Sequence, residues 1–354
     1  MDDEKEWNLE LSEYIKQGEP TKKEKAKTWT TAIGLQDVDH LVPSEYLVDT
    51  AKEHIEGNIN IEEAKERIDT YYEEVGARKQ RIETNKEADK VSVRITEILS
   101  ERAFNFSPTE LFNIHKRLFD GIFDKAGEAR DYNITKKEWV LNNDTVTYSS
   151  FGIIKDALEY DFEQERKFSY KDVPIDEAIK HLCKFVSNIW QIHPFCEGNT
   201  RTVAVFMIKY LRTFGFNIND EVFANNSWYF RNALVRANYN NYKKNVFYDY
   251  SFLEKFFYNL LTNSKYELKS RFAHVDYVSK EEDKDREKRD YSLEEQAILN
   301  IISSNPTAKQ EDIAKDIKKS LRTVKSYMAL LQEKDIIERK NGKRNGEWVV
   351  NKHR

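Results

Sequence analysis

Apolar residues recur at intervals of three and four along most of this chain. The clearest run follows Thr200, where apolar and aromatic positions share one helical face before Gly215, a residue that can end a helix. The same period predicts helices at residues 84–102, 107–119, 151–168 and 176–191. We therefore expect a mainly α fold.

Capping residues delimit two more predicted helices nearer the N-terminus. Ser44 can cap a helix that Gly57 ends, because a serine oxygen accepts from free N–H groups and glycine tolerates a left-handed C-terminus. Asn60 with Glu63 has the form of a capping box and predicts a second helix over residues 60–74.

One segment breaks the helical period. Residues 138–148, EWVLNNDTVTY, place Val, Thr, Trp and Tyr around two asparagines and an aspartate. Residues of the first kind favour strands and those of the second favour tight turns. The segment therefore predicts a short β-hairpin among helices.

A highly charged segment precedes the last part of the chain. Residues 279–290 contain eleven charged side chains and no large apolar one, which marks a domain boundary. Beyond it, three predicted helices precede two strand-like pieces joined by NGKRNG, at residues 293–303, 310–317, 320–334, 336–340 and 347–351. Three helices and a basic hairpin are typical of a winged helix-turn-helix.

Composition narrows the class of protein. The 354 residues are 39% hydrophobic and 34% charged, and the formal charge of −5 argues against whole-chain affinity for nucleic acid or membrane. The N-terminus has no apolar signal core, and no window approaches ~18 apolar residues, so no membrane span is expected. Cys183 and Cys196 are the only cysteines, which favours a cytoplasmic location.

The segment HPFCEGNTRT, residues 193–202, carries the candidate chemistry. Gly198, Asn199 and Thr200 lie where the next helix begins, and free N–H groups and the helix dipole attract an anion there. Arg201 adds a bidentate donor suited to phosphate. These features together predict a phosphate site.

Two ionisable residues beside this site complete a reaction centre. Glu197 could hold a Mg²⁺ that bridges to phosphate oxygens, and His193 could take a proton from an incoming hydroxyl. The set predicts phosphoryl or nucleotidyl transfer. Each residue alone also has an ordinary structural role, as a cap, a solvated side chain or a core histidine. Cys196 is an alternative nucleophile that no other feature supports.

The segment resembles the Fic motif, H-P-F-x-D/E-G-N-x-R, at every position up to the arginine. Two further stretches are similar to parts of the same family. AGEARDYNITKKEWVLNNDTVTYSS resembles the turn and flap that precede the motif, and SWYFRNALVRANY resembles the helix that lines the nucleotide pocket. Fic-like sequence thus covers residues 85–265 approximately.

The resemblance implies a helical bundle with a small β-hairpin flap, and AMPylation, the transfer of AMP from Mg-ATP to a Ser, Thr or Tyr hydroxyl of a protein. It makes His193 the general base, Glu197 the Mg²⁺ ligand and Arg201 a phosphate clamp. By the same resemblance, Phe195 anchors the loop, Gly198, Asn199 and Thr200 cradle phosphates, Tyr229 and Asn232 line the nucleotide pocket, and Glu138, Trp139, Val140 and Val146 form the flap that aligns the target. The flap also fits simple cover of the core.

Two positions depart from the family pattern. The motif usually continues G-R-x-x-R, whereas this chain has Thr200 for the glycine and Ala204 for the second arginine, which normally binds the γ-phosphate. Doc-like relatives also lack that arginine and act as kinases with the nucleotide reversed. Phosphate transfer is therefore an alternative to AMP transfer. A DNA-binding regulator that senses nucleotide without turnover is a third possibility.

The segment KEHIEGN, residues 52–58, resembles the family's inhibitory motif, S/T-x-x-x-E-G/N, with Lys52 in place of the usual Ser or Thr. The resemblance implies that Glu56 competes with ATP for the cationic site. Its usual partner corresponds to Ala204, so we expect Arg201 or another basic residue to take that part. These motifs do not identify the protein target, for which the chain itself is one candidate.

The predicted winged helix offers a basic surface to DNA. Residues 320–354 hold nine Lys or Arg against four acids, and the expected DNA contacts are Arg322, Thr323 and Lys325 on the third helix and Lys343 and Arg344 in the wing. A winged helix also serves for packing or protein contact. The predicted organisation is an N-terminal region with the inhibitory-type helix (1–84), a Fic domain (85–275), a linker (276–290) and the winged helix (291–354).

Overall fold

The computed structural model describes residues 6–76, 83–216, 220–277, 291–340 and 346–351. Within these ranges the chain is mainly α, as the periodicity predicts. The α-helices are α1 (Glu6–Gln17), α2 (Pro20–Gly34), α3 (Glu45–Glu56), α4 (Ile61–Gly76), α5 (Glu83–Ser100), α6 (Pro108–Phe119), α7 (Ile154–Lys167), α8 (Ile175–Ile192), α9 (Asn199–Thr213), α10 (Asp220–Ala237), α11 (Ser251–Thr262), α12 (Ser270–Ala273), α13 (Leu293–Ser304), α14 (Gln310–Asp316) and α15 (Leu321–Glu333).

Short 3₁₀ turns and one two-stranded sheet complete the described elements. The turns are η1 (Leu35–Asp39), η3 (Trp139–Leu141), η4 (Phe151–Ile153) and η5 (Tyr242–Lys244). The strands β1 (Ile337–Lys340) and β2 (Glu347–Val350) pair antiparallel, with Ile337 opposite Val350.

The predicted caps of α3 and α4 are confirmed. The Ser44 hydroxyl accepts from the Leu47 N–H at 3.1 Å, and Gly57 ends α3 with φ +88°. Asn60 and Glu63 each accept from the other's backbone N–H at 2.8 Å. Local sequence thus determines these helix ends.

Helices α1 and α2 were not predicted from the sequence. The first turns of α2 are almost wholly charged and its second half is rich in threonine, a β-branched residue with low helix propensity. That second half is nevertheless buried, with Trp29 and Ala32 fully inaccessible. Packing against α1, α5 and α10 therefore stabilises a helix that propensity alone disfavours.

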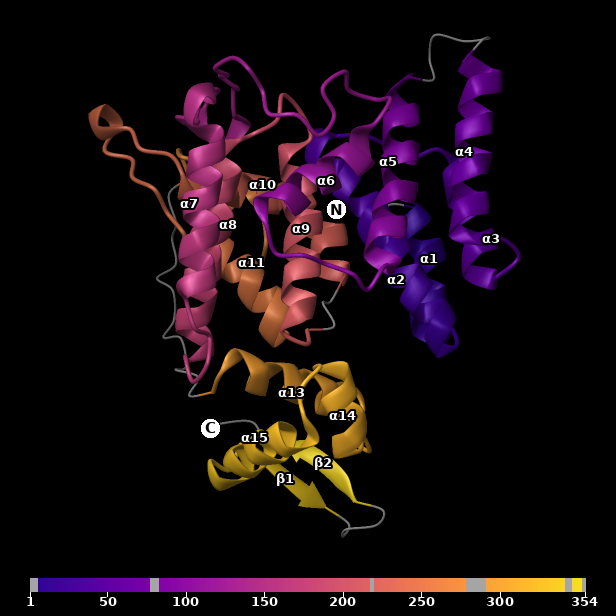
Figure 1. Ribbon diagram of the computed structural model, residues 1–354, viewed down its shortest axis with the longest axis vertical. Coiled ribbons are helices and arrows are strands. Elements are labelled where there is room, and N and C mark those ends of the chain that lie inside the picture. The colour runs from indigo at the N-terminus through magenta and orange to yellow at the C-terminus, as the bar shows by residue number, and fades with distance from the viewer. Residues whose placement is uncertain (1–5, 77–82, 217–219, 278–290, 341–345, 352–354) are drawn as a thin grey trace.

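The helices form one body above the winged helix (Figure 1). The N-terminal helices α1–α4 lie at one side, and α8 and α9 pack together within the body. The main core runs from α5 through α9 and α10 to the C-terminal helices, while a second cluster lies between α1, α2, α3 and α4. The N-terminal region is thus built onto the bundle through α2.

The predicted hairpin at 138–148 is present only as one bridge. Glu138 pairs with Asp144, and the 3₁₀ turn η3 lies between them. Val140 and Val146 are buried in the core, so their apolar side chains fix a compact turn where a two-stranded ladder was expected. Residues 145–149 continue as extended chain beside the end of α8, where Gln191 Nε2 donates to Thr147 O at 3.0 Å.

The C-terminal elements form the expected three helices and β-hairpin. This winged helix is joined to the helical body by hydrogen bonds from Ile175 N to Tyr291 O (2.8 Å) and from Asn300 Nδ2 to Leu261 O (2.8 Å). Gly215 at the end of α9 lies against Ile317, where an added Cβ would come within 2.6 Å of that residue. The main apolar core is continuous from the bundle into this domain.

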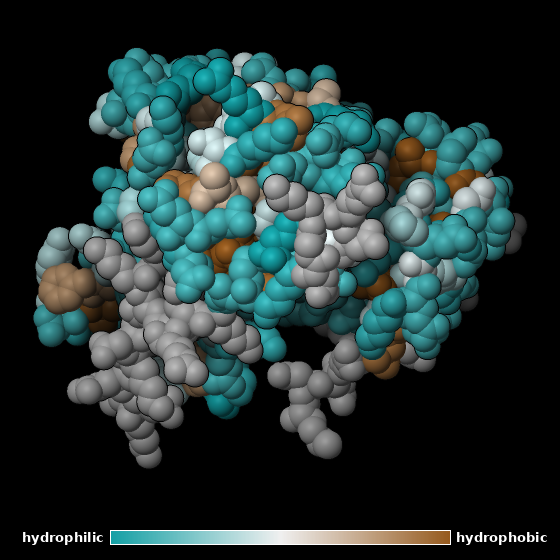
Figure 2. Space-filling model, turned by 90° about the horizontal axis from the view of Figure 1, so that it is seen from below, coloured by the Kyte–Doolittle hydropathy of each residue, from teal (hydrophilic) through white to brown (hydrophobic). Residues whose placement is uncertain are grey.

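Seen from the winged-helix side, the surface is mostly hydrophilic (Figure 2). None of the helices in the described ranges combines the length and the apolar character that crossing a membrane requires.

Candidate active site

The motif forms the loop between α8 and α9, and left-handed residues bound it. His193 follows α8 with φ +49°, and Gly198 precedes α9 with φ +72°. A Cβ on Gly198 would lie 2.4 Å from the Phe119 ring. Glycine is therefore needed here both for backbone conformation and for space.

Contacts inside the loop hold its shape. The Asn199 side chain accepts from Phe195 N at 3.0 Å and donates to Phe195 O at 2.8 Å. The Phe195 ring stacks on His115, with ring centroids 3.7 Å apart. Phe195 thus anchors the loop in the core, and the Asn199 amide fixes the backbone instead of reaching toward a ligand.

His115 and Arg130 support the loop from outside the motif, and no sequence argument gave either of them a role. Gly127 N donates to His115 Nδ1 at 2.8 Å, so the ring's proton lies on Nε2, which donates to Glu197 O at 3.0 Å. Burial lowers the His115 pKa to about 4 and keeps the ring neutral. Arg130 is buried and donates through Nε to His193 O at 2.8 Å. Its place in the AGEAR turn was the available signal.

His193 has the arrangement of a base. Its Nδ1 lies 3.1 Å from Trp190 O, and a carbonyl can only accept, so the proton lies on Nδ1. Burial lowers the His193 pKa well below its usual value, and the nearby Lys136 charge adds to the effect. The ring is therefore neutral near pH 7, with the Nε2 lone pair available. The Tyr148 ring, 4.4 Å away, covers it.

Glu197 is the exposed member of the motif. Its side chain is 59% exposed and forms an ion pair with Lys136 Nζ at 2.9 Å. No cluster of three metal-ligating side chains occurs among the described residues. A single exposed carboxylate at a helix N-terminus suits a Mg²⁺ whose other ligands are phosphate oxygens and water.

Arg201 is buried and already paired. Its Nη2 lies 2.5 Å from Glu87 Oε1 and 2.9 Å from Asp39 Oδ2, and Nη1 donates to Gln36 Oε1 at 3.0 Å. The guanidinium lies over the Phe119 ring at 4.9 Å, and its Nε is a buried donor without a hydrogen-bond partner. The N-terminal elements η1 and α5 thus occupy the cationic group of the motif.

Asp39 links Arg201 to a second arginine. Its Oδ1 lies 3.2 Å from Arg231 Nη1, and Arg231 Nη2 binds both oxygens of the buried Glu138 at 3.1 Å. The carboxylates of Asp39, Glu87 and Glu138 therefore surround both guanidinium groups. The sequence did not indicate this cluster, because its five members come from five distant segments.

Three other expected nucleotide-binding side chains face inward. Thr200 Oγ1 accepts from Trp190 Nε1 at 2.9 Å, and the Tyr229 hydroxyl donates to Phe252 O at 3.1 Å. Asn232 donates to Trp228 O at 2.9 Å, and its buried Oδ1 has no hydrogen-bond partner. In this structure the Thr200 and Tyr229 hydroxyl groups are already hydrogen-bonded, to an indole and to a backbone group, and their contact with a nucleotide stays a prediction.

Most of the predicted flap residues are buried as well. Glu138, Val140 and Val146 are buried, and only Trp139 is exposed, at 46%.

Cys196 is half-buried and hydrogen-bonds Tyr132, while His193 Nδ1 is held by Trp190. Among the described residues, no hydrogen bond joins Cys196 to His193, so the structure adds no support for Cys196 as a nucleophile.

Glu56 does not reach Arg201. It pairs with Lys22 and accepts from Tyr14, and the Lys22 hydrogen bond lowers its pKa. The end of α3 packs against α1 and the start of α2, which holds Glu56 away from the motif. Of the two expected partners, Arg201 or another basic residue, the structure shows the second, Lys22, while Arg201 pairs with Asp39 and Glu87. The inhibitory role of Glu56 stays a prediction.

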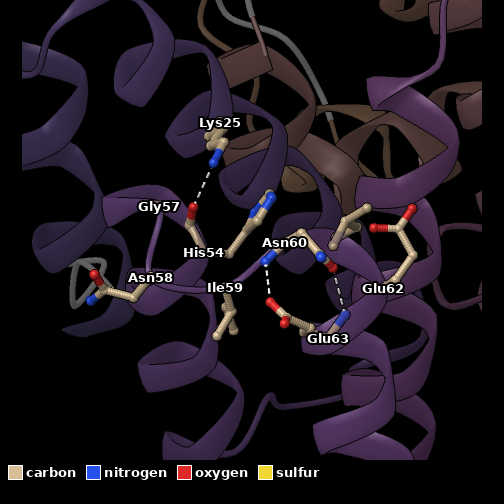
Figure 3. Close-up of a pocket in the computed structure, with 9 residues that line it drawn as sticks. Lys25, His54, Gly57, Asn58, Ile59, Asn60, Glu62 and Glu63 are labelled. Atoms are coloured by element: carbon tan, nitrogen blue, oxygen red, sulfur yellow. Dashed lines mark hydrogen bonds between the residues drawn. The ribbon is translucent and has the colours of Figure 1, made fainter.

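A cavity of about 500 Å³ lies at the turn between α3 and α4, away from the motif (Figure 3). Lys25 of α2 donates to His54 O at 2.7 Å, above the reciprocal Asn60–Glu63 cap bonds in the figure. Its lining comes from the N-terminal region alone. The cavity shares no residue with the motif loop.

The predicted DNA-contacting residues lie on α15 and in the wing. Arg322 and Lys325 are exposed, whereas Thr323 is half-buried and its N–H caps onto Ser320 Oγ at 3.1 Å. Lys343 and Arg344 lie outside the described residues.

Comparison with known proteins agrees with this division of the chain. A model of the Fic/DOC family matches residues 105–211, and a model of winged helix-turn-helix DNA-binding domains matches residues 295–338. No curated protein matches the chain in sequence. The first match supports a transferase that acts on proteins, and the second supports DNA as a partner. The chain therefore contains a Fic/DOC family domain, followed by a winged helix-turn-helix domain.

Proposed function

We propose that the protein is an adenylyltransferase that moves AMP from Mg-ATP to a Ser, Thr or Tyr hydroxyl of a protein. The observation that carries the proposal is the state of His193. Its Nδ1–H is held by Trp190 O and its pKa lies well below the usual value, so Nε2 can accept a proton near pH 7. A histidine that served only as a core residue would not need a free Nε2 beside a helix N-terminus.

The proposed reaction uses the residues of the loop in order. His193 Nε2 accepts the proton of the acceptor hydroxyl, and the hydroxyl oxygen attacks the α-phosphorus. The bond from that phosphorus to the bridging oxygen of the β-phosphate breaks, and pyrophosphate leaves. The free N–H groups at the start of α9 and the Arg201 guanidinium would stabilise the phosphate charge.

Glu197 would hold Mg²⁺ together with phosphate oxygens, and the ion would neutralise charge on the leaving group. The Lys136 side chain now pairs with that carboxylate, at 2.9 Å. Lys136 therefore has to release Glu197 when the ion binds, and its ammonium group is then close enough to pair with phosphate.

The acceptor would dock on the chain that leads into the flap. In the described structure, no backbone–backbone hydrogen bond is formed by residues 133–137, and most of their side chains are exposed or half-buried. Extended chain with free N–H and C=O groups can accept an added strand. Such pairing would bring an acceptor hydroxyl toward His193, since Lys136 in this segment already contacts the motif.

We further propose that Asp39 and Glu87 restrain the enzyme. Their carboxylates neutralise Arg201, which is 2% exposed and would otherwise be the guanidinium nearest the phosphate site. A nucleotide phosphate has to displace at least one of them. This arrangement replaces the inhibitory contact that the sequence assigned to Glu56.

The winged helix would bind DNA through α15, whose Arg322 and Lys325 are exposed. Such binding would be sensitive to salt, because lysine and arginine contacts to phosphate release counterions.

Label transfer with Mg²⁺ tests the reaction. ATP labelled at the α-phosphate and, separately, at the γ-phosphate would be incubated with the protein and a cell lysate. We expect label from the α-phosphate only, lost in His193→Ala. A kinase remains the second candidate, because the usual place of the second arginine is the fully buried Ala204. The other arginine of α9, Arg212, lies in its last turn and donates to Leu99 O.

Each outcome has one meaning. Label only from the γ-phosphate would establish phosphate transfer and contradict the proposal. An absence of label from either position, with salt-dependent binding to DNA retained, would favour a nucleotide-sensing regulator. Label that persists in His193→Ala would remove the histidine from its proposed role.

A further inference from the structure

A short hairpin carries three exposed aromatic side chains close together in the described bundle. Residues 239–250 turn back through η5, closed by the isolated bridge between Asn241 and Val246. Tyr242 is 78% exposed, Phe247 50% and Tyr248 59%. The hairpin projects from the body of helices at the left edge of Figure 1. We call residues 239–250 the aromatic hairpin.

Hydrogen bonds fix the backbone of the aromatic hairpin. Asn241 and Val246 exchange backbone hydrogen bonds at 2.7 and 3.0 Å, and the Asn241 side chain accepts from Lys244 N at 3.1 Å. Asp249 N donates to Arg236 O at 2.9 Å, which ties the returning strand to the end of α10. The rings are therefore held outward by a defined backbone.

Its surface combines apolar rings with positive charge. The Tyr242 and Phe247 rings pack edge to face, with centroids 5.8 Å apart. Lys243 and Lys244 are exposed between them and form no ion pair with any described residue. Figure 2 shows apolar side chains at the same edge of the molecule. Exposed aromatic side chains are typical of an interaction surface, because their rings bury a large area with little loss of flexibility, and neighbouring cations add charge complementarity.

The base of the aromatic hairpin is joined to the flap. Asp144 Oδ2 accepts from the Tyr239 hydroxyl at 2.7 Å and from Asn241 Nδ2 at 3.3 Å. Asp144 is also the bridge partner of Glu138. One aspartate thus fixes the hairpin to the segment on which the acceptor is proposed to dock.

We propose that the aromatic hairpin is a second docking surface for the acceptor protein, and that it selects an acidic segment with exposed side chains that can pack on its rings. The inference rests on the proposed function, because the acceptor at the flap is its occupant. Lys243 and Lys244 supply the charge complementarity, and the three rings supply the apolar contact. The hairpin would raise the local concentration of the acceptor hydroxyl beside the loop.

Position favours a protein partner over DNA held by the winged helix. In Figure 1 the aromatic hairpin lies near the top of the helical body, whereas α15 and the β1–β2 hairpin lie below it. DNA bound along α15 is therefore far from the aromatic hairpin. The flap, in contrast, contacts it directly through Asp144.

Binding of defined probes to the full chain tests the inference without turnover. A fluorescent random copolymer of glutamate and tyrosine, its lysine–tyrosine counterpart and a single-stranded oligothymidylate would be compared by anisotropy. The variants are Tyr242→Ser with Phe247→Ser and Tyr248→Ser, and separately Lys243→Glu with Lys244→Glu. Tyr160→Ser is the matched control, since Tyr160 is 62% exposed on α7, away from the flap.

We expect the acidic copolymer to bind the wild type and the control equally, and to bind each hairpin variant about ten-fold or more weakly. The lysine variant guards against misfolding, because its side chains are wholly at the surface. Equal binding by all variants would overturn the inference. So would hairpin-dependent binding of the oligothymidylate alone, or a concentration-dependent dimer that only the aromatic variant abolishes.

The two proposals fail separately. If label is transferred normally but copolymer binding does not depend on the hairpin, the docking surface is wrong and the adenylyltransferase stands. If the copolymer binds through the hairpin but no label is transferred from the α-phosphate, the chemistry is wrong and the surface stands.

Discussion

Gly198 sets the geometry of the catalytic loop at the scale of a single residue. Its φ of +72° turns the chain into α9, and the Phe119 ring fills the space where a Cβ would lie. The same ring lies under the Arg201 guanidinium, at 4.9 Å. A side chain at position 198 would therefore disturb both the loop and the phosphate clamp.

The substitution Gly198→Ala should lower the free energy of unfolding by roughly 2–4 kcal/mol, since the methyl group meets the ring at 2.4 Å and the backbone is left-handed. Gly57→Ala is the matched control. Gly57 has φ +88° and nothing within 4 Å of an added Cβ, so only the backbone term of about 1 kcal/mol applies. Urea denaturation compares them, and equal losses would show that the Phe119 contact relaxes freely.

At the scale of elements, η1 connects the N-terminal region to the chemistry. Gln36 accepts a hydrogen bond from Arg201, and Asp39 forms ion pairs with both Arg201 and Arg231. This turn of five residues thus supplies one of the two carboxylates that neutralise the Arg201 guanidinium. Its effect depends on α2, which places it against α9 and α10.

Asp39→Asn should raise ATP affinity and label transfer about three- to ten-fold, because one of the two carboxylates that neutralise Arg201 loses its charge. Glu87 still pairs with the arginine in this variant, so no uncompensated buried charge is left. Titration with ATP and the initial rate of label transfer measure the two effects.

Glu56→Gln is the control for that experiment. Glu56 pairs with Lys22 at the surface, so its amide should leave ATP affinity unchanged. A gain in Glu56→Gln without a gain in Asp39→Asn would return the inhibitory role to Glu56.

Helix α15 is the second element with a separable function. Arg322→Glu with Lys325→Glu should weaken binding to double-stranded DNA and reduce the slope of log affinity against log salt by about two, one for each phosphate contact. Lys315→Glu, with a side chain 79% exposed on α14, is the matched control and should change binding less. Unchanged affinity in the double variant would show that α15 serves packing or protein contact.

At the scale of the whole molecule, buried histidines tie stability to pH. Burial lowers the pKa of His54 and His115 to about 4, and that of His193 well below its usual value. The unfolded chain binds protons to these rings at about pH 6.5, whereas the folded chain does not. Their contribution to stability is therefore fully present above pH 6.5 and is lost as the pH falls toward 4.

We expect the free energy of unfolding to fall between pH 6.5 and 5 by up to ~1.4 kcal/mol per pH unit for each such histidine. His54→Gln should reduce the slope of the unfolding free energy against pH by the contribution of one proton. Glutamine keeps the local contact, since its side-chain oxygen can accept from Trp29 Nε1, now 2.9 Å from His54 Nδ1. Urea denaturation at each pH measures the slope. A slope that His54→Gln leaves unchanged would show that this ring titrates normally.

Much of the fold and of the motif could be predicted because the information is local. Ser44, Gly57 and the Asn60–Glu63 pair specify helix ends through contacts within a few residues. The motif loop is local in part: Asn199 fixes its shape through Phe195, four residues earlier, whereas Gly198 meets Phe119 of the distant α6. The winged helix was recognised for the same reason, from periodicity and one basic turn.

The tertiary structure alone decided how the site is held and restrained. Helix α2 forms because burial of Trp29 and Ala32 outweighs a poor local propensity. The sequence predicted Arg201 or another basic residue as the partner of Glu56; packing pairs Glu56 with Lys22 and brings Asp39 and Glu87 to Arg201. Charge pairs between distant segments depend on how helices pack, which no spacing along the chain records. The sequence by itself therefore determined which groups are candidates for the chemistry, and only the fold decided which of them are already paired.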